Sequence, residues 1–482
     1  MSASDKNVAM EDLIWMPARE IARLIRAGEI SAVEAMNAHY DQIDANNPTL
    51  NAIVNLIPRD QALALARVAD DKTVNGSVLG PLHGLPMAAK DTVELAGFPT
   101  TWGFVPWAER VAEKDERLAA RERQAGALFV GKTNMPEFGL GSHTFNDLFG
   151  VTLNPYDPER TPGGSSGGAA AALATGMLPL ADGSDMGGSL RNPASFCNVV
   201  GLRPSIGRLP DDRGFGWFGR IATAGPMART VSDAALLLSV QAGPVHDDPL
   251  SLPDSGATFE AALDLDPTSL RLACSVDLGM VPVDGEVAGL IEQAAEIFDG
   301  LGSKVDNACP DLSGAMDVFQ VQRAATYAIT GRALDQSLPN WRDYAKDTAI
   351  WNIEQGFSLT AEQLLRSEVE RTAIYRRIAE FFENYDALLL PAAQVPPFPI
   401  DQEWVREING QSMDTYIDWM TICCVISVTG LPAISVPCGF TAGGLPVGLQ
   451  IVGRPRGDFD LLRIAHLFEQ ATLYHTQRPP VG

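Results

Sequence analysis

The sequence is poor in cysteine and has no long apolar run. Its 482 residues include six cysteines, and none of them forms a CxxC pair. This pattern indicates neither a disulfide framework nor a zinc knuckle and is typical of buried thiols in a reducing compartment. Nowhere do roughly 18 apolar residues follow one another, as a membrane span requires, and the first residues lack the features of a signal peptide. We therefore expect a cytoplasmic protein that crosses no membrane.

Basic residues are also scarce relative to acidic ones. The chain has 36 lysines and arginines against 60 aspartates and glutamates, for a net charge of −24. Such a charge repels polyanions, so binding of nucleic acid through a basic face is not expected. The hydrophobic fraction of 46% is typical of a folded globular protein.

Histidine is sparse, which restricts the possible catalytic chemistry. Only three of the six histidines follow Ser165. The six are scattered and lack the spacing of metal ligands, so no metal or other cofactor is expected. Ser165 nevertheless satisfies the pattern G-x-S-x-G. A Ser-His-Asp esterase of the α/β-hydrolase type, with Ser165 as nucleophile and His475 as the nearest candidate base, therefore stays open as an alternative.

What the sequence does contain is a pair of serines framed by glycines. Ser165 lies in GGSSGG and Ser189 in DMGGSLR, and an alanine-rich segment joins them. Glycines allow the backbone to approach a ligand closely. A Gly-rich loop before a helix also attracts anions, but Gly168 is followed by alanine rather than the lysine of a P-loop. The pattern thus favours serine chemistry over nucleotide binding.

A lysine in an apolar run supplies a candidate base. Lys90 ends the segment LPMAAK, and a serine nucleophile without histidine can use lysine instead. The ordinary lysine pKa of about 10.4 must fall for this role, which burial achieves by disfavouring the ammonium form. A lysine that extends to the surface from a strand end is the structural alternative.

Together these segments resemble the amidase signature family of serine hydrolases. The core pattern comprises GGSSGG at 163–168, the alanine-rich helix that follows, and GSDMGGSLR at 183–191. Further blocks such as GLPMAAKD, GKTNMPEFG and GLPAISVPCGF extend the resemblance over about residues 13–475, with a weak match at 250–390.

The resemblance implies an α/β fold in one large domain, with a central mixed β-sheet covered by helices on both faces. We expect a helical N-terminal segment at 1–60 and the amidase signature domain at 61–482, with a more helical, variable insertion at about 251–394.

It also implies a Ser-Ser-Lys triad. Ser189 would be the nucleophile that forms an acyl-enzyme, Ser165, which follows a cis peptide bond in the family, would shuttle protons, and Lys90 would be the base. The oxyanion hole would consist of the backbone N–H groups of Met186, Gly187, Gly188 and Ser189.

Other candidate residues surround this triad. Ser166, Asp185 and Arg191 are expected to support and position it. The substrate-binding candidates are Asn134 and Met135 in TNMPEFG, which also contains Glu137, and the aromatic residues Phe215, Trp217 and Phe218. These aromatic residues would line an acyl pocket, and core packing is an equally good explanation for them.

The predicted function is hydrolysis of a small apolar or aryl carboxamide to a carboxylic acid and ammonia or an amine. The oligomeric state stays open, with a homodimer as one possibility. The alternative within the family is the glutaminase component of a tRNA-dependent amidotransferase. Such glutaminases carry a Ser/Leu-Asp-Gln run before the GP-x-AR block, where this chain has RIATAG at 220–225.

Two helix starts can also be predicted. Ser31 with Glu34, and Thr360 with Gln363, form capping boxes. The first helix is expected to end at Asn46–Pro48. The second is expected to run through Glu383 and to bury the apolar residues Leu364, Leu365, Val369, Ile374, Ile378 and Phe381.

Overall fold

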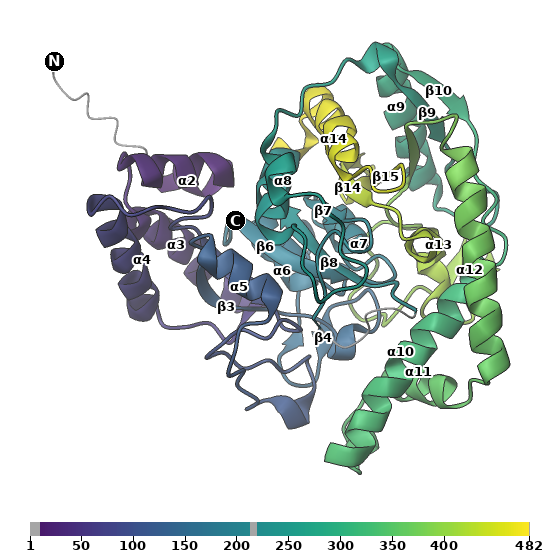
Figure 1. Cartoon of the computed structure of the whole chain (residues 1–482), viewed down its shortest axis with the longest axis horizontal. Coiled ribbons are helices and arrows are strands. Elements are labelled where there is room, and N and C mark those ends of the chain that lie inside the picture. Colours follow the sequence, from purple (N-terminus) through teal and green to yellow (C-terminus); the bar gives the residue numbers. More distant parts are fainter. Residues whose placement is uncertain (1–9, 213–218, 482) are drawn as a thin grey trace.

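The computed structural model describes residues 10–212 and 219–481 and is built on an eight-stranded mixed sheet (Figure 1). The strand order is β10-β9-β11-β15-β14-β7-β8-β6, with β10, β9 and β11 parallel and all other neighbours antiparallel. This confirms the predicted fold class. The strands are β6 (Leu180–Asp185), β7 (Val200–Arg203), β8 (Thr223–Ala228), β9 (Arg271–Cys274), β10 (Lys304–Asn307), β11 (Ala387–Pro391), β14 (Ala433–Phe440) and β15 (Pro446–Gly453).

A smaller sheet of three strands carries Lys90. Strand β2 (Pro86–Lys90) is parallel to β3 (Leu128–Thr133), which pairs antiparallel with β1 (Ile53–Val54). The backbone N–H of Lys90 donates to Asp182 Oδ1 of β6 at 2.8 Å. Lys90, at the end of β2, is therefore fixed against the edge of the main sheet. Two further hairpins pair β4 (Phe145–Asn146) with β5 (Gly150–Val151) and β12 (Glu407–Ile408) with β13 (Gln411–Ser412).

Helices surround the two sheets in groups (Figure 1). The N-terminal group lies at one end of the molecule and α10–α12 lie at the other. The N-terminal half contains α1 (Met10–Trp15), α2 (Ala18–Ala27), α3 (Ala32–Leu50), α4 (Arg59–Val74), α5 (Arg117–Gln124), α6 (Gly167–Ala174), α7 (Arg191–Phe196) and α8 (Val231–Gln241). The C-terminal half contains α9 (Gly285–Gly300), α10 (Ala315–Ser337), α11 (Asp347–Phe357), α12 (Ala361–Phe381), α13 (Thr421–Thr429) and α14 (Asp458–Thr472).

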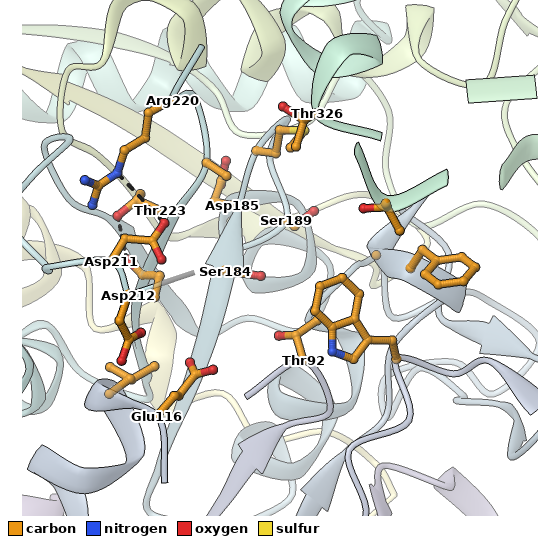
Figure 2. A pocket seen from close by; sticks show the side chains of 18 of the residues that line it. Thr92, Glu116, Ser184, Asp185, Ser189, Asp211, Asp212, Arg220, Thr223 and Thr326 are labelled. Carbon is orange, nitrogen blue, oxygen red and sulfur yellow. Dashed lines mark hydrogen bonds and ion pairs between the residues drawn. The ribbon is translucent and has the colours of Figure 1, made fainter. Parts of the chain in front are cut away.

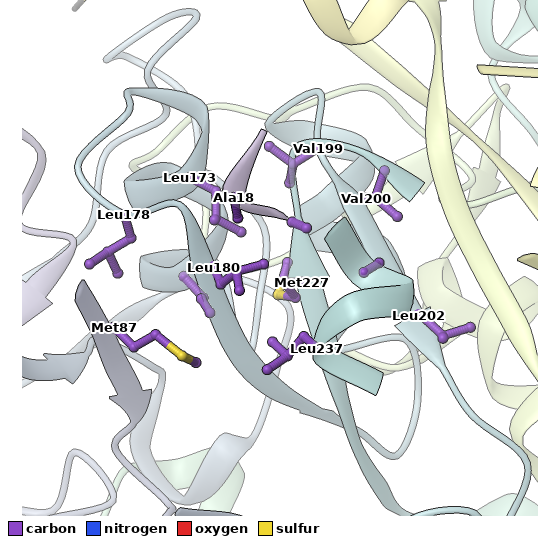
Figure 3. Packing of buried hydrophobic residues seen from close by; sticks show 14 of the residues in the cluster. Ala18, Met87, Leu173, Leu178, Leu180, Val199, Val200, Leu202, Met227 and Leu237 are labelled. Carbon is purple, nitrogen blue, oxygen red and sulfur yellow. The ribbon is translucent and has the colours of Figure 1, made fainter. Parts of the chain in front are cut away.

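The core packs around β6, which leads to the candidate site. Leu180 of β6 lies among Met227 of β8, Leu237 of α8 and Leu173 of α6 (Figure 3). Helix α6 is wholly buried and consists of glycine, alanine and one leucine. A Cβ at Gly168 would come within 2.4 Å of the Asn134 backbone nitrogen, so only small residues let this helix pass between the two sheets.

Both capping boxes are confirmed, but two details of the helices differ from prediction. Helix α3 continues through Pro48 to Leu50, although a proline at this position removes one helical hydrogen bond. In α12 the predicted burial is wrong for Leu365 and Val369, which are 67% and 73% exposed. This helix lies at the outer edge of the molecule and buries only the opposite side, with Ile374 and Ile378.

Within residues 10–212 and 219–481, no helix has the length and apolar character needed to span a membrane. The cytoplasmic location, the domain boundaries and the homodimer stay predictions from the sequence.

Candidate active site

A cavity of about 480 Å³ opens beside the C-terminal end of β6. Ser165, Ser184 and Ser189 all contribute to its wall, and Figure 2 shows Ser184 and Ser189 there. Ser184 and Asp185 are the last two residues of β6, and Ser189 lies in the turn that connects this strand to α7. Strand β6 therefore places Ser184 and the turn with Ser189 at the cavity.

Lys90 is buried and its terminal nitrogen faces three serines. Its Nζ atom lies 2.8 Å from Ser165 Oγ, 2.9 Å from Ser166 Oγ and 3.1 Å from Ser184 Oγ. The side chain is fully enclosed, so it does not extend to the surface as the structural alternative proposed. The sequence pattern alone gave no reason to include Ser184.

The turn that presents Ser165 is fixed by hydrogen bonds to its carbonyl groups. The Gly164–Ser165 peptide bond is cis, as the resemblance implies. Ser142 Oγ donates to the Gly164 carbonyl at 2.7 Å, and Thr144 Oγ1 donates to that of Gly163 at 2.8 Å. Helix α6 begins two residues after Ser165. The Ser165 hydroxyl is thereby held at Lys90 with only 2% of the residue exposed.

The turn that contains Ser189 is organised by Asp185. Asp185 Oδ1 accepts from the Gly188 N–H at 2.9 Å, and Oδ2 accepts from the Leu190 N–H at 3.1 Å. Arg191 donates to both carboxylate oxygens, at 2.8 and 3.0 Å. The Ser166 N–H also donates to the Ser189 carbonyl at 3.2 Å, which joins the two serine segments.

Asp185 and Arg191 form a fully buried ion pair. Burial alone would raise the pKa of Asp185, but the charge and hydrogen bonds of Arg191, with a contribution from Arg203, hold the pKa well below its usual range. Arg191 also donates to Gln450 and Ser427, which anchors α7 to the sheet and to α13. This geometry fits a supporting role for the pair.

The four N–H groups expected to stabilise an oxyanion are not equivalent. That of Gly188 is occupied by Asp185. In the described part of the chain, the N–H groups of Met186, Gly187 and Ser189 have no protein acceptor. A Cβ at Gly187 would approach Phe319 Cζ to 2.9 Å, so a larger residue there would have to displace the Phe319 ring.

Two of the five substrate-binding candidates lie away from the cavity wall. Asn134 and Met135 are fully buried and do not line the cavity. Asn134 instead bonds the Thr152 hydroxyl at 3.0 Å and the Asn146 amide at 2.8 Å, which organises the neighbouring loop. Phe215, Trp217 and Phe218 lie outside the described residues.

The cavity has an aromatic end that comes from other segments. Trp102 and Trp107 approach edge to face with centroids 6.1 Å apart, and Trp107 lies 5.6 Å from Phe138. Tyr327 of α10 donates its hydroxyl to the Phe138 carbonyl at 3.2 Å. All four line the cavity. In the sequence, only the segment TTWGFVPW, shortly after Lys90, could have indicated that these two tryptophans lie near the site.

The opposite end of the cavity is charged. Glu116, Asp211, Asp212 and Arg220 line the cavity, and Figure 2 shows them together on one side of Ser184 and Ser189. Arg117 and Arg121 also line this end. The cavity therefore offers an apolar surface on one side of the serines and a polar one on the other.

The loop between the aromatic end and Ser165 is held by a buried acid. A Cβ at Gly139 would lie 3.6 Å from Ser165 Oγ. Next to it, Glu137 Oε1 accepts from the Lys346 backbone N–H at 3.0 Å, while Lys346 Nζ donates to the Leu140 carbonyl at 2.7 Å. Burial raises the pKa of Glu137 to about 7 and lowers that of Lys346 to about 8.

The geometry argues against the Ser-His-Asp alternative. All six histidines lie in the described part of the chain, and none lines the cavity. His475 follows α14, in a short 3₁₀ turn, and Ser165 faces an amine rather than an imidazole.

Comparison with known proteins gives matches over nearly the whole chain. The Amidase family model matches residues 34–462. An acylamidase from Rhodococcus erythropolis is 36% identical over 473 residues, covering 97% of this chain and 98% of the relative. The A subunit of the glutamyl-tRNA(Gln) amidotransferase from Carboxydothermus hydrogenoformans is 33% identical, with 97% and 99% covered. The structure of a bacterial aryl acylamidase superposes with a TM-score of 0.89 at 29% identity, covering 96% of this chain and 98% of that one.

The fold and these matches define the chain as an amide hydrolase of the α/β class. It belongs to the amidase signature family.

Proposed function

We propose that this protein hydrolyses a carboxamide with an apolar or aryl group to a carboxylic acid and ammonia or an amine. Ser189 is the nucleophile, Ser165 the proton shuttle and Lys90 the base. The observation that carries this proposal is the contact of Lys90 Nζ with Ser165 Oγ at 2.8 Å, in a cavity that Ser189 also lines.

In the proposed relay, the proton passes from Ser189 through Ser165 to Lys90. Neutral Lys90 accepts a proton from Ser165, which in turn accepts the proton of Ser189 as its oxygen attacks the amide carbonyl. The tetrahedral intermediate collapses when Ser165 gives a proton to the leaving nitrogen and regains one from Lys90. Water then attacks the acyl-enzyme while Ser165 and Lys90 accept its proton in the same way, and this proton passes to Ser189 as the acid leaves.

Backbone N–H groups stabilise the negative oxygen of the tetrahedral intermediate. Gly187 and Ser189 supply the proposed donors, together with Met186, because their N–H groups have no acceptor in the described part of the chain. Gly188 contributes indirectly, since its N–H donates to Asp185 and so shapes the turn. Each such donor is worth on the order of 3 kcal/mol of barrier.

The aromatic end of the cavity supports the substrate class. Trp102, Trp107, Phe138 and Tyr327 present flat apolar surfaces that suit an aryl or alkyl group. The names of an acylamidase relative and of an aryl acylamidase structure agree with this assignment.

The glutaminase component of an amidotransferase is the second candidate, because such a protein matches at 33% identity over most of the chain. Residues 220–225, RIATAG, lack the Ser/Leu-Asp-Gln run of that group. Glutamine hydrolysis that requires a copurifying partner would favour the second candidate.

Release of ammonia or amine from a panel of aryl, alkyl and small aliphatic amides and glutamine tests the proposal. The wild type should prefer the aryl and alkyl amides, and Ser189→Ala should abolish turnover. Full activity of Ser189→Ala would contradict the mechanism, and exclusive hydrolysis of small aliphatic amides would contradict the substrate class. Asp233→Asn, in a buried residue that bonds the N-terminal segment, is the matched control.

A further inference from the structure

Two buried polar atoms of the cavity-lining residues have no hydrogen-bond partner among the described residues. They are Nε1 of Trp102 and Oγ1 of Thr92, and both residues line the cavity. Thr92 is 8% exposed, and Figure 2 shows its side chain at the cavity. A buried donor that stays unpaired costs free energy. These two atoms therefore point to a partner that the protein itself does not supply.

Trp102 and Thr92 are joined through the backbone. The Trp102 N–H donates at 3.3 Å to the carbonyl of Asp91, the residue that precedes Thr92. The Asp91 carboxylate accepts from the backbone N–H groups of Thr101 and Gly103, at 3.2 and 3.3 Å. These two residues flank Trp102 in the sequence. The two unpaired atoms thus belong to one hydrogen-bonded unit of the cavity wall.

The backbone of Trp102 has an unusual conformation, which this unit maintains. Its φ is +53°, in the left-handed region that large side chains rarely adopt. Phe138 also has a φ of +53°, and its N–H donates to the Trp102 carbonyl at 2.9 Å. Such conformations persist where the surroundings hold them, and they cluster at functional sites. The loop is therefore fixed by its backbone, and the indole N–H stays available.

The chemistry of the two atoms defines the group that they can bind. An indole N–H can only donate a hydrogen bond, whereas a hydroxyl can donate or accept. A single acceptor can therefore satisfy both. The guanidinium at this end of the cavity, that of Arg110, is already paired with Glu94 at 2.8 Å. An uncharged oxygen thus fits this apolar wall better than a carboxylate, which would need a counter-charge.

We propose that Trp102 and Thr92 are specificity-determining residues that bind an uncharged oxygen on the apolar or aryl group of the substrate. The indole N–H and the Thr92 hydroxyl both donate to this oxygen. The inference rests on the proposed function and narrows its substrate class to amides whose apolar group carries an ether or carbonyl oxygen. A purely hydrocarbon group would leave both donors unpaired.

The test compares methoxy- and ethyl-substituted benzamides and acetanilides, with the substituent at the ortho, meta or para position. The two substituents are similar in size, but only methoxy accepts a hydrogen bond. Kd is measured in the Ser189→Ala background, where the proposed mechanism allows no cleavage, and kcat/KM is measured with Ser189 present. The methoxy-to-ethyl ratio of each variant is divided by that of its parent, which cancels differences in hydrophobicity and ring electronics.

Two variants remove the donors with little change in shape. Trp102→Phe removes the indole N–H, and Thr92→Val replaces the hydroxyl with a methyl group. Each should lower the preference for methoxy by about 3- to 10-fold, as expected for one neutral hydrogen bond, at the ring position that reaches the two donors.

Two matched controls remove the same groups away from the cavity. Trp419 Nε1 and Thr133 Oγ1 are also buried without a partner in the described part of the chain, but neither residue lines the cavity. Trp419→Phe and Thr133→Val should therefore leave the preference for methoxy unchanged.

The outcomes separate this inference from the proposed function. If wild type hydrolyses these amides but neither Trp102→Phe nor Thr92→Val changes the preference at any ring position, the inference alone is overturned. An equal change in the two controls would also overturn it. If the Kd preference changes as expected but wild type hydrolyses no amide, the proposed function fails and the oxygen site stands. If the amides are neither bound nor hydrolysed, both fail, and if Thr92→Val does not fold, Trp102→Phe decides by itself.

Discussion

The Nζ atom of Lys90 lies 2.8 Å from Oγ of Ser165, although 75 positions separate the two residues in the sequence. Strand β2 brings the lysine to this point and the turn before α6 brings the serine. Lys90→Met keeps the volume and apolar stem but removes the base. We expect kcat/KM for amide hydrolysis to fall by about 10³-fold with little loss of thermal stability. The exposed Lys72→Met should keep full activity, and comparable activity of both variants would contradict the role of Lys90.

Ser184 contacts the same amine but lies outside the proton path that we propose. Its hydroxyl lies 3.1 Å from Lys90 Nζ, and a hydrogen bond to a charged group is worth roughly 1.5–3 kcal/mol. Ser184→Ala should therefore lower kcat by about 10- to 100-fold, less than Ser165→Ala. Single-turnover kinetics on an aryl amide would measure both variants. Equal losses in the two would contradict the assignment of Ser165 as the shuttle.

Asp185 carries the counter-charge of the fully buried Arg191. Asp185→Asn leaves the Arg191 guanidinium buried without its counter-charge, and such a break costs about 3–5 kcal/mol of unfolding free energy. Because its folded pKa lies below the unfolded one, the wild-type contribution is complete above about pH 4 and falls as acid is added. Urea unfolding at several pH values should show this dependence in the wild type and its loss in the variant. In Asp247→Asn, which breaks an exposed pair with Arg117, no comparable change is expected.

Glu137 destabilises the fold when it ionises, because burial raises its pKa to about 7. The folded state then binds more protons than the unfolded one between about pH 4.3 and 7, so this contribution to stability falls as pH rises through that interval. Glu137→Gln still accepts the Lys346 N–H. Its melting temperature should rise relative to wild type from pH 5 to pH 8. A constant difference between the two proteins would show that Glu137 does not titrate in this interval.

Trp107 forms part of the aromatic end of the cavity. The Arg110 guanidinium lies over its ring, with Cζ 4.5 Å from the ring centroid. Trp107→Ala should raise KM for aryl amides by about tenfold through lost apolar contact and leave a small aliphatic amide unchanged. Trp351 packs on Tyr416 away from the cavity, so Trp351→Ala should alter neither substrate. Equal effects of Trp107→Ala on both substrate classes would contradict an aryl-binding end.

Local motifs carried much of the prediction. The capping boxes at Ser31 and Thr360 depend on residues three positions apart, so the sequence alone locates both helix starts. Which side of a helix is buried could not be predicted in the same way. Leu365 and Val369 have helical spacing, yet they are exposed because α12 lies at the edge of the molecule and packs on one side only.

The sequence by itself determined the family, the class of reaction and the candidate residues Lys90, Ser165 and Ser189, because short glycine-framed segments contain them. Only the tertiary structure decided which groups meet. It added Ser184 and the aromatic wall of Trp102 and Trp107, and it showed that the Gly188 N–H donates to Asp185. These relationships join residues on separate strands, helices and loops, and their distances are set by how two sheets pack around a helix of small residues.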